Sequence, residues 1–354
     1  MRTTISIALA TYNGERYLSE LLDSIAAQTL QPYELIVSDD HSTDNTRAII
    51  ETFASKVAFK VSFASNTKTK GILGNFASAF ERCTGDLIAY CDQDDIWYPQ
   101  KLEKAATFFD DPKIKLVIHR SEAVNQNLEP LGYDIPPIGS VEFGRTAFPS
   151  SYEMTYGLGH QMLFDACLYR DYHPMFQHNI QALHAIAENY DTQFSFLAGL
   201  CGDIIMLEDT LVKFRRHQHA TSDAGITSSN DATTQGFLGK TSNEYQLKAE
   251  ELRSIIQAIR TDIIETLPAY KQSLLTYCDF LEHRAKLFNK RSHIYINQQC
   301  ISRLTSLVNL LTHCAYRRKS KAGFGRKALI VDTAVAIFGL NGLKKLIRLK
   351  AKIR

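Results

Sequence analysis

The chain has 354 residues, 45% of them hydrophobic, which is enough to bury the core of one large domain with an appendage or of two domains. Its seven cysteines form no Cys-x-x-Cys pair, and this argues against a disulfide framework or a cysteine zinc site. Because residues 1–5 lead straight into an apolar strand without a signal-peptide pattern, we expect a cytoplasmic protein.

The net charge is only +2, but it is unevenly distributed along the chain. Residues 315–354 carry twelve basic side chains and the single acid Asp332, which gives this segment a charge of +11 and leaves −9 for the residues before it. A basic end on an acidic body suggests that the end has an anionic partner.

The chain opens with a pattern that is typical of a nucleotide-binding α/β unit. Residues 3–10 predict a strand, the sequence Thr11-Tyr12-Asn13-Gly14 breaks it, and residues 15–28 carry leucine and isoleucine at helical spacing. At the carboxyl end of a strand, the ring of Tyr12 is suited to stack on a nucleobase, although a surface loop tyrosine is the plain alternative.

A second predicted strand, residues 33–38, ends at Asp39-Asp40 ahead of a helix that runs through residue 50. One of these acids is expected to act as a turn or cap residue, and the other is placed to accept a hydrogen bond from the imide of a uracil or thymine ring. A third strand, a polar loop and a helix follow, at residues 57–63, 66–71 and 74–80.

An acidic turn follows the most apolar predicted strand. Residues 87–91 form a buried run that stops at Asp92-Gln93-Asp94-Asp95. Because ligands bind at the carboxyl ends of the strands in an open α/β sheet, Asp92 and Asp94 are placed to share a divalent cation that faces a diphosphate. A solvated acidic turn is the alternative. Trp97, the only tryptophan, is expected to pack under the turn and hold it.

The next part of the chain predicts a strand at residues 114–119, a loop-rich insertion at 121–151 that would shape substrate specificity, and an apolar run at 162–167 that would line the acceptor side. His160 is more typical of a satisfied loop histidine than of a ligand contact. Glu188 and Asp191 precede an apolar run, and either is suited to the first turn of a helix.

The last third of the chain is predicted to be helical. We expect domains at residues 1–225 and 240–354, joined by a Ser, Thr, Gly and Asp-rich linker. Beyond residue 340, apolar side chains share one helical face and basic ones lie off it, which favours an interfacial helix on anionic lipid over a spanning one. A solvated tail or nonspecific nucleic-acid contact is the alternative. We expect no nucleic-acid partner, and a homodimer through the helices stays open.

Taken together, roughly residues 3–222 resemble the family 2 glycosyltransferases of the GT-A fold, which is an α/β fold. The resemblance rests on the order of three segments, namely Ala10-Thr11-Tyr12-Asn13, Ser38-Asp39-Asp40-His41-Ser42-Thr43-Asp44 and Asp92-Gln93-Asp94-Asp95-Ile96-Trp97.

The resemblance implies roles for individual residues. Asp40 would accept the imide N–H, Asp94 would be the direct ligand of Mg²⁺ or Mn²⁺, and Asp191 would be the catalytic base. The segment Phe214-Arg215-Arg216-His217 is similar to a closing Tyr-Arg-x-His element, with phenylalanine in place of tyrosine. The implied donor-binding set is Thr11, Tyr12, Asn13, Asp40, Lys70, Asn75, Asp92 and Arg215, and the implied metal ligands are Asp92, Asp94 and His217.

In function, the resemblance implies an inverting glycosyltransferase of bacterial cell-surface polysaccharide synthesis, such as O-antigen or capsule, at the inner face of the plasma membrane. Its acceptor would be lipid-linked or a polysaccharide. The amino-acid sequence of the acidic turn is similar to that of rhamnosyltransferases. We therefore expect dTDP-rhamnose as the donor, with a UDP-hexose or UDP-hexosamine as the alternative. An inactive carbohydrate-binding module stays open. A nicotinamide oxidoreductase is disfavoured because the first turn lacks Gly-x-Gly-x-x-Gly.

Overall fold

The computed structural model describes residues 3–136, 143–147, 158–172, 189–217, 242–296, 299–312, 329–330 and 332–337. The chain divides into two compact units, residues 1–220 and 221–354, which we describe separately. The predicted linker and the amphipathic tail beyond residue 340 lie outside the described residues.

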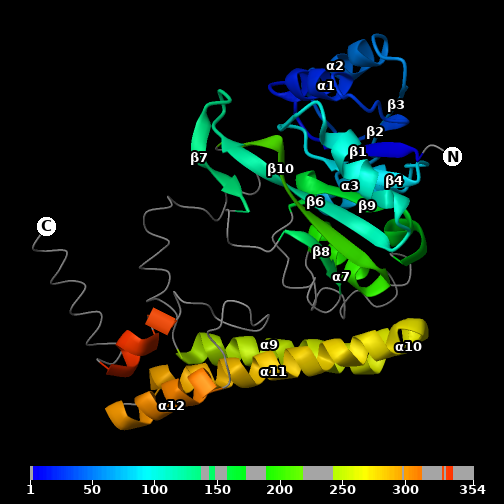
Figure 1. The fold of residues 1–354 in the computed structure, drawn as a ribbon. Helices are drawn as coiled ribbons and strands as arrows, with labels where there is room; N and C mark the ends of the chain where they lie inside the picture. Colours follow the sequence, from blue (N-terminus) through cyan, green and yellow to red (C-terminus); the bar gives the residue numbers. More distant parts are fainter. Residues whose placement is uncertain are drawn as a thin grey trace, which may run out of the picture. The chain divides into compact units, whose positions relative to one another are not determined.

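Unit 1 is built on one mixed sheet (Figure 1). Its strands are β1 (Ile5–Thr11), β2 (Glu34–Asp39), β3 (Lys60–Ser65), β4 (Leu87–Cys91), β5 (Ile96–Trp97), β6 (Ile114–Val124), β7 (Pro130–Ile135), β8 (Gly144–Ala147), β9 (Met162–Asp165) and β10 (Asp203–Arg215). The described strands follow the order β3-β2-β1-β4-β9-β6-β10-β5, with β7 on β6 and β8 on β10. Because β1 to β4 are mutually parallel, their carboxyl ends meet at the same edge.

The helices of unit 1 follow the apolar periodicity of the sequence. They are α1 (Leu18–Ala26), α2 (Thr46–Ala54), α3 (Gly71–Phe80), α4 (Lys101–Ala106) and α7 (Tyr190–Cys201). On α1 the buried side chains are the expected Leu18, Leu21, Leu22 and Ile25. Every residue of β4 is buried, as is typical of a strand that is covered on both faces.

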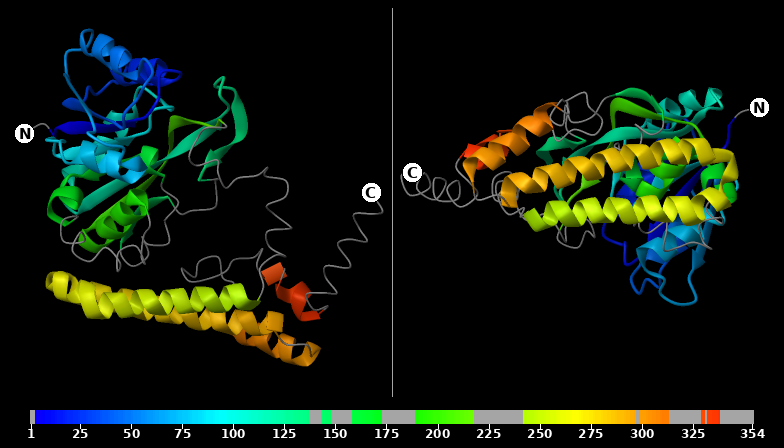
Figure 2. Two further views of the ribbon diagram at one scale, coloured as in Figure 1. Left: turned by 180° about the vertical axis from the view of Figure 1, so that it is seen from behind. Right: turned by 90° about the horizontal axis from the view of Figure 1, so that it is seen from below.

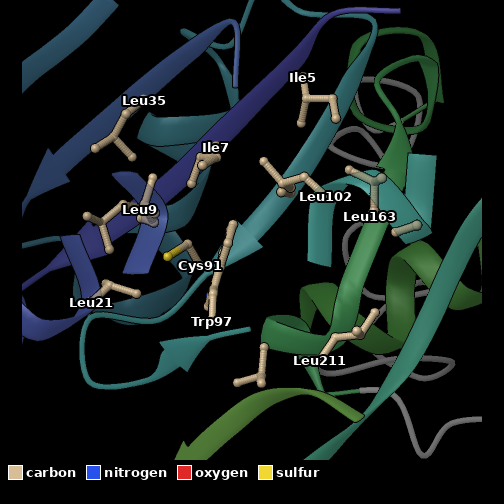
Figure 3. Packing of buried hydrophobic residues seen from close by; sticks show 14 of the residues in the cluster. Ile5, Ile7, Leu9, Leu21, Leu35, Cys91, Trp97, Leu102, Leu163 and Leu211 are labelled. Carbon is tan, nitrogen blue, oxygen red and sulfur yellow. The ribbon is translucent and has the colours of Figure 1, made fainter. Parts of the chain in front are cut away.

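The core of the sheet includes Cys91 and Trp97, which lie on either side of the acidic turn in the sequence (Figure 3). Trp97 is 2% exposed and packs in one cluster with Leu21, Cys91 and Leu211. Its strand β5 pairs with β10, so the tryptophan fixes the turn between β4 and β5 against the end of β10. The expectation that Trp97 packs under the turn is confirmed.

The described part of the insertion predicted at residues 121–151 contains regular strands. β6 continues to Val124 and forms a hairpin with β7. The Asn125 side chain closes the connection by accepting from the backbone N–H groups of Asn127 and Glu129, and Leu128 adopts a left-handed conformation. A turn of this kind is specified by one side chain and leaves little signal in the hydrophobic pattern.

Unit 2 is helical, as predicted. Its elements are α9 (Ser242–Ala258), α10 (Ile264–Thr266), α11 (Lys271–Ile296) and α12 (Cys300–Thr312). α9 and α11 lie side by side (Figure 2). A separate core joins Leu287 and Ile294 of α11 to Leu307 and Leu310 of α12. Among the described helices, none is long and apolar enough to span a bilayer.

Candidate active site at the strand ends

The turns that follow β1, β2 and β4 come together at the carboxyl edge of the sheet. Gln93, the middle residue of the Asp-x-Asp sequence, accepts from the Tyr12 backbone N–H at 2.9 Å and donates to the Tyr12 carbonyl at 3.1 Å. The Tyr12 ring stays 56% exposed. Its backbone is therefore fixed while its ring is accessible, as the predicted stacking on a nucleobase requires.

The first two turns are tied to each other by a short polar network. Thr11 donates from Oγ1 to Asp39 Oδ1 at 2.9 Å, and the Asn13 backbone N–H donates to the Ser42 hydroxyl at 2.9 Å. Asn13 Oδ1 in turn accepts from the Thr43 backbone N–H at 2.9 Å. Asp39 thus acts as a turn residue, as was expected of one acid of this pair. The donor-binding roles of Thr11 and Asn13 remain predictions.

The second acid, Asp40, is only 4% exposed and already has partners. Its Oδ1 accepts from the backbone N–H of Lys70 at 2.8 Å, and its Oδ2 accepts from that of Gly71 at 2.9 Å, at the start of α3. A nucleobase imide would have to share these oxygens. Asn75 is also engaged, donating to the Thr11 carbonyl at 3.0 Å. The Lys70 ammonium donates to the Ser78 hydroxyl, and its contact with a diphosphate remains a prediction.

The three carboxylates of the acidic turn differ sharply in burial. The exposed fraction of the side chain falls from 34% at Asp92 to 19% at Asp94 and 0% at Asp95. Asp95 accepts from the Arg215 backbone N–H through Oδ1, and its Oδ2 has no hydrogen-bond partner. Burial, followed by the charges of Asp94 and Asp92, raises the pKa of Asp95 well above its ordinary value.

A buried lysine, Lys101, lies beneath these acids. Its ammonium donates to the His160 carbonyl at 2.7 Å and sits 3.6 Å from the centre of the Trp97 ring. Burial lowers the pKa of Lys101 to about 7, and the negative charges around it, including that of Asp95, oppose the shift. The lysine offsets part of the negative charge that the turn concentrates behind its surface.

Arg215 was expected to hold a phosphate oxygen, and this expectation is wrong. Its side chain is 2% exposed, and its guanidinium donates to the carbonyls of Asp94 at 2.8 Å and Gln126 at 2.7 Å and to the Glu20 carboxylate. These groups come from three separate parts of unit 1. The arginine therefore positions the acidic turn from inside the protein instead of contacting ligand.

Two overlapping sets of side chains at the turn are suited to a divalent cation. Asp94 Oδ2 lies 2.8 Å from His217 Nε2, which brings two of the predicted ligands together. The second set, Asp92, Asp95 and His160, has one ligand atom from each residue within 4.8 Å of the others. Carboxylates and a neutral imidazole suit Mn²⁺, and carboxylates suit Mg²⁺, so both sets fit the expected ion.

The two sets differ in the charge beside them. In the deeper set, the partly protonated Lys101 lies close enough to Asp95 for its positive charge to favour the carboxylate and to oppose a second cation. His160 was predicted to be a loop histidine whose hydrogen bonds are satisfied. In the structure, its two ring nitrogens differ in how close their partners lie. Its Nε2 contacts the Ser121 hydroxyl at 3.0 Å, whereas its Nδ1 faces Asp92 and Asp95 at 3.7 and 3.6 Å. We therefore retain Asp94 and His217, with Asp92 beside them, as the metal ligands to test.

Asp191 lies where the sequence placed it, in the first turn of α7. Its Oδ1 accepts from the Thr192 backbone N–H at 2.7 Å. Burial raises the pKa of Asp191, and the negative charge of Asp92 raises it further, so the two carboxylates are near enough to interact. A carboxylate with a raised pKa is a stronger base than an exposed one. Glu188 lies outside the described residues.

A mixed sheet of this topology, with acids at the strand ends and a helical region after it, is the GT-A type of glycosyltransferase fold, and the predicted fold class is confirmed. Residues 6–170 match the model of glycosyl transferase family 2. That segment runs from β1 through β9 and includes the acidic turn, so the similarity to this family covers the strand ends that carry the candidate site.

Two curated relatives show how far the similarity extends. The chain is 32% identical over 123 residues to UDP-Glc:alpha-D-GlcNAc-diphosphoundecaprenol beta-1,3-glucosyltransferase WfgD of Escherichia coli, covering 35% of this chain and 47% of the relative. It is 33% identical over 123 residues to poly(ribitol-phosphate) beta-N-acetylglucosaminyltransferase TarS of Staphylococcus aureus, covering 34% and 21%. The chain thus spans less than half of the length of these relatives.

Among solved structures, S. aureus TarS 1-349 in complex with UDP-GlcNAc matches with a TM-score of 0.53 at 18% identity. The match covers 94% of this chain and 91% of that one, so the similarity of fold includes the helical region.

The residues that hold the acidic turn in place from the interior were not identified from the sequence. No role was assigned to Gln93 or to Lys101 from the sequence. Neither had a usable signal, because a buried lysine is recognised only when its surroundings are known. Glu20, the acid that pairs with Arg215, lies 195 positions away from it in the sequence.

Replacing Arg215 tests its internal role. We expect Arg215→Lys to lower the free energy of unfolding by about 2–4 kcal/mol, because lysine leaves buried carbonyls without a donor. Urea denaturation measures the loss. The control Arg16→Lys, at an exposed residue with one hydrogen bond of 3.3 Å, should change stability by less than about 0.5 kcal/mol. Unchanged stability of Arg215→Lys together with weaker nucleotide binding would restore the phosphate role.

A matched pair of isosteric variants separates the two metal sets. We expect Asp94→Asn to weaken Mn²⁺ binding about tenfold or more, because it removes a carboxylate ligand and its charge. Asp95→Asn should keep the affinity within about a factor of two. Calorimetric titration of the folded variants with Mn²⁺ makes the comparison. The opposite ranking would assign the ion to Asp92, Asp95 and His160.

Proposed function

We propose that the chain is an inverting glycosyltransferase, which transfers one sugar from a nucleoside-diphosphate donor to a hydroxyl group of a glycan acceptor. The observation that carries the proposal is the placement of Asp191. A buried carboxylate with a raised pKa interacts electrostatically with Asp92 of the acidic turn. A base on one side and a turn suited to a diphosphate on the other are what a single displacement needs.

In this mechanism, Asp191 accepts the proton of the acceptor hydroxyl as its oxygen attacks the anomeric carbon. The bond from that carbon to the diphosphate oxygen breaks on the opposite face, and the configuration inverts. The exposed ring of Tyr12 stacks on the nucleobase, and Gln93 keeps that tyrosine in register with the acidic turn. A divalent cation at Asp94 and His217 would neutralise charge on the departing diphosphate.

For the donor, the relatives favour the alternative over the first expectation. The E. coli relative is named for UDP-Glc, and the S. aureus structure contains UDP-GlcNAc. Both relatives are named for β linkages, which displacement with inversion gives from an α-configured donor. A UDP-hexose or UDP-hexosamine is therefore the proposed donor, ahead of dTDP-rhamnose.

We place the reaction in bacterial polysaccharide synthesis, on a lipid-linked or polymeric acceptor at the inner face of the plasma membrane. The name of the E. coli relative, which specifies a diphosphoundecaprenol substrate, supports a lipid-linked acceptor. The basic sequence beyond residue 340 supports attraction to anionic lipid. A homodimer through unit 2 remains part of the proposal.

Substituting the base tests the activity. We expect Asp191→Asn to lower kcat about 10²–10⁴-fold, with UDP binding unchanged, because the amide accepts the Thr192 hydrogen bond but takes no proton. UDP release from UDP-glucose or UDP-GlcNAc is measured with an α-GlcNAc-diphosphate lipid. The control Asp209→Asn changes an exposed acid and should leave kcat unaltered.

The pH dependence gives the same test a second readout. Since burial raises the pKa of Asp191, the base is ionised only above that raised value. The acid limb of kcat should therefore lie at higher pH than for an exposed aspartate. Wild-type protein that binds UDP without any turnover, across several acceptors, would favour the inactive carbohydrate-binding alternative.

The choice of donor is tested by binding. We expect UDP to bind more tightly than dTDP, and both to bind more tightly with Mn²⁺, because a cation held at the acidic turn would offset the negative charge of the diphosphate. Isothermal titration with each nucleotide, with and without the ion, makes the comparison. Tighter binding of dTDP would return rhamnose to first place.

A further inference from the structure

Helix α12 in unit 2 carries apolar side chains on an exposed face. Ile301, Leu304, Val308 and Leu311 are 79%, 38%, 56% and 45% exposed. Their spacing of three, four and three residues places them along one side of the helix. We refer to these four residues as the α12 stripe.

The stripe is separate from the face that holds α12 in unit 2. The buried face consists of Arg303, Leu307 and Leu310, which pack with residues of α11 and with residues 335–336. Arg303 donates from Nε to the Ala336 carbonyl at 3.1 Å. The helix is therefore fixed on one side, and within the described part of the chain its apolar stripe faces away from the core. A contiguous exposed apolar surface of this kind marks a binding surface more often than chance.

The sequence that follows α12 is strongly basic. Residues 300–312 contain no acid, and residues 313–354 carry twelve basic side chains. The one acid of that segment, Asp332, is buried and neutralised by Arg291, with Arg291 Nε 2.8 Å from Asp332 Oδ2. The positive charge that follows α12 in the sequence has no acidic counterpart in the same segment.

We propose that the α12 stripe docks on the surface of an anionic lipid bilayer, with α12 lying in the interface. An apolar stripe along one side of a helix and a basic sequence that follows it in the chain are the two components of interfacial binding here. A second copy of the chain fits less well, because each copy carries the same basic sequence after α12 and like charges repel each other. The basic tail of the same chain fits less well too, because α12 offers it no acid.

This inference goes beyond the proposed transfer reaction and does not rest on it. Vesicle binding is measured without a sugar nucleotide, so a protein that fails to transfer sugar still reports on the stripe. Conversely, Asp191→Asn lies in unit 1 and should bind vesicles as the wild type does.

The test uses the full chain and sedimentation with vesicles. Phosphatidylcholine vesicles are compared with vesicles of equal parts phosphatidylcholine and phosphatidylglycerol. We expect binding to the anionic vesicles only, weakened by added salt because the attraction is screened. The double variant Ile301→Gln with Val308→Gln should bind about tenfold more weakly, because it removes exposed apolar area without changing charge.

The matched control is Leu247→Gln, which changes a 57% exposed leucine of α9 outside the stripe and should bind as the wild type does. Thermal unfolding checks that all variants fold. Equal binding of the double variant and the wild type would show that basic residues act alone, and would overturn the proposal. If the wild type does not bind anionic vesicles but self-associates, and the double variant does not self-associate, the stripe would be assigned to contact with a second copy of the chain.

Discussion

A buried guanidinium holds together the part of unit 1 where chemistry is expected. Arg215 ends β10, and its side chain reaches the acidic turn after β4, the hairpin connection after β6 and the acid Glu20 on α1. Removing a buried charge from such a network leaves its partners unsatisfied, which costs far more than the loss of a surface ion pair. The geometry of the acidic turn therefore depends on a residue that does not face the ligand.

That constraint explains why three neighbouring acids take different roles. Asp95 is pulled inward by the Arg215 backbone and by the nearby Lys101, so it serves the interior. Asp92 and Asp94 remain on the accessible side, where a cation and a diphosphate are able to reach them. The three carboxylates thus differ in how deeply they are buried. The charged groups behind the turn hold its geometry in place before any ligand binds.

The family match and the geometry of the structure support different residues of the candidate site. The match ends at residue 170, so the acidic turn lies inside it, whereas Asp191, Arg215 and His217 lie beyond it. For those three residues, position in the structure is the evidence. It supports Asp191 as a base and pairs His217 with Asp94, and it corrects Arg215. Unit 2 adds the α12 stripe, an exposed apolar face to which we assign the proposed membrane contact independently of the site.

The sequence alone predicted β1 to β4 with the helices between them, the boundaries of β4, the packing of Trp97 and Asp191 as a candidate for the first turn of a helix. These features follow from local periodicity and strand-end chemistry, which a few neighbouring residues encode. Only the tertiary structure decided that Arg215 is internal, that Gln93 clamps Tyr12 and that Asp95 is the buried acid. Each depends on groups brought together from 81 to 195 positions apart, and spacing along the chain carries no record of which charges become neighbours.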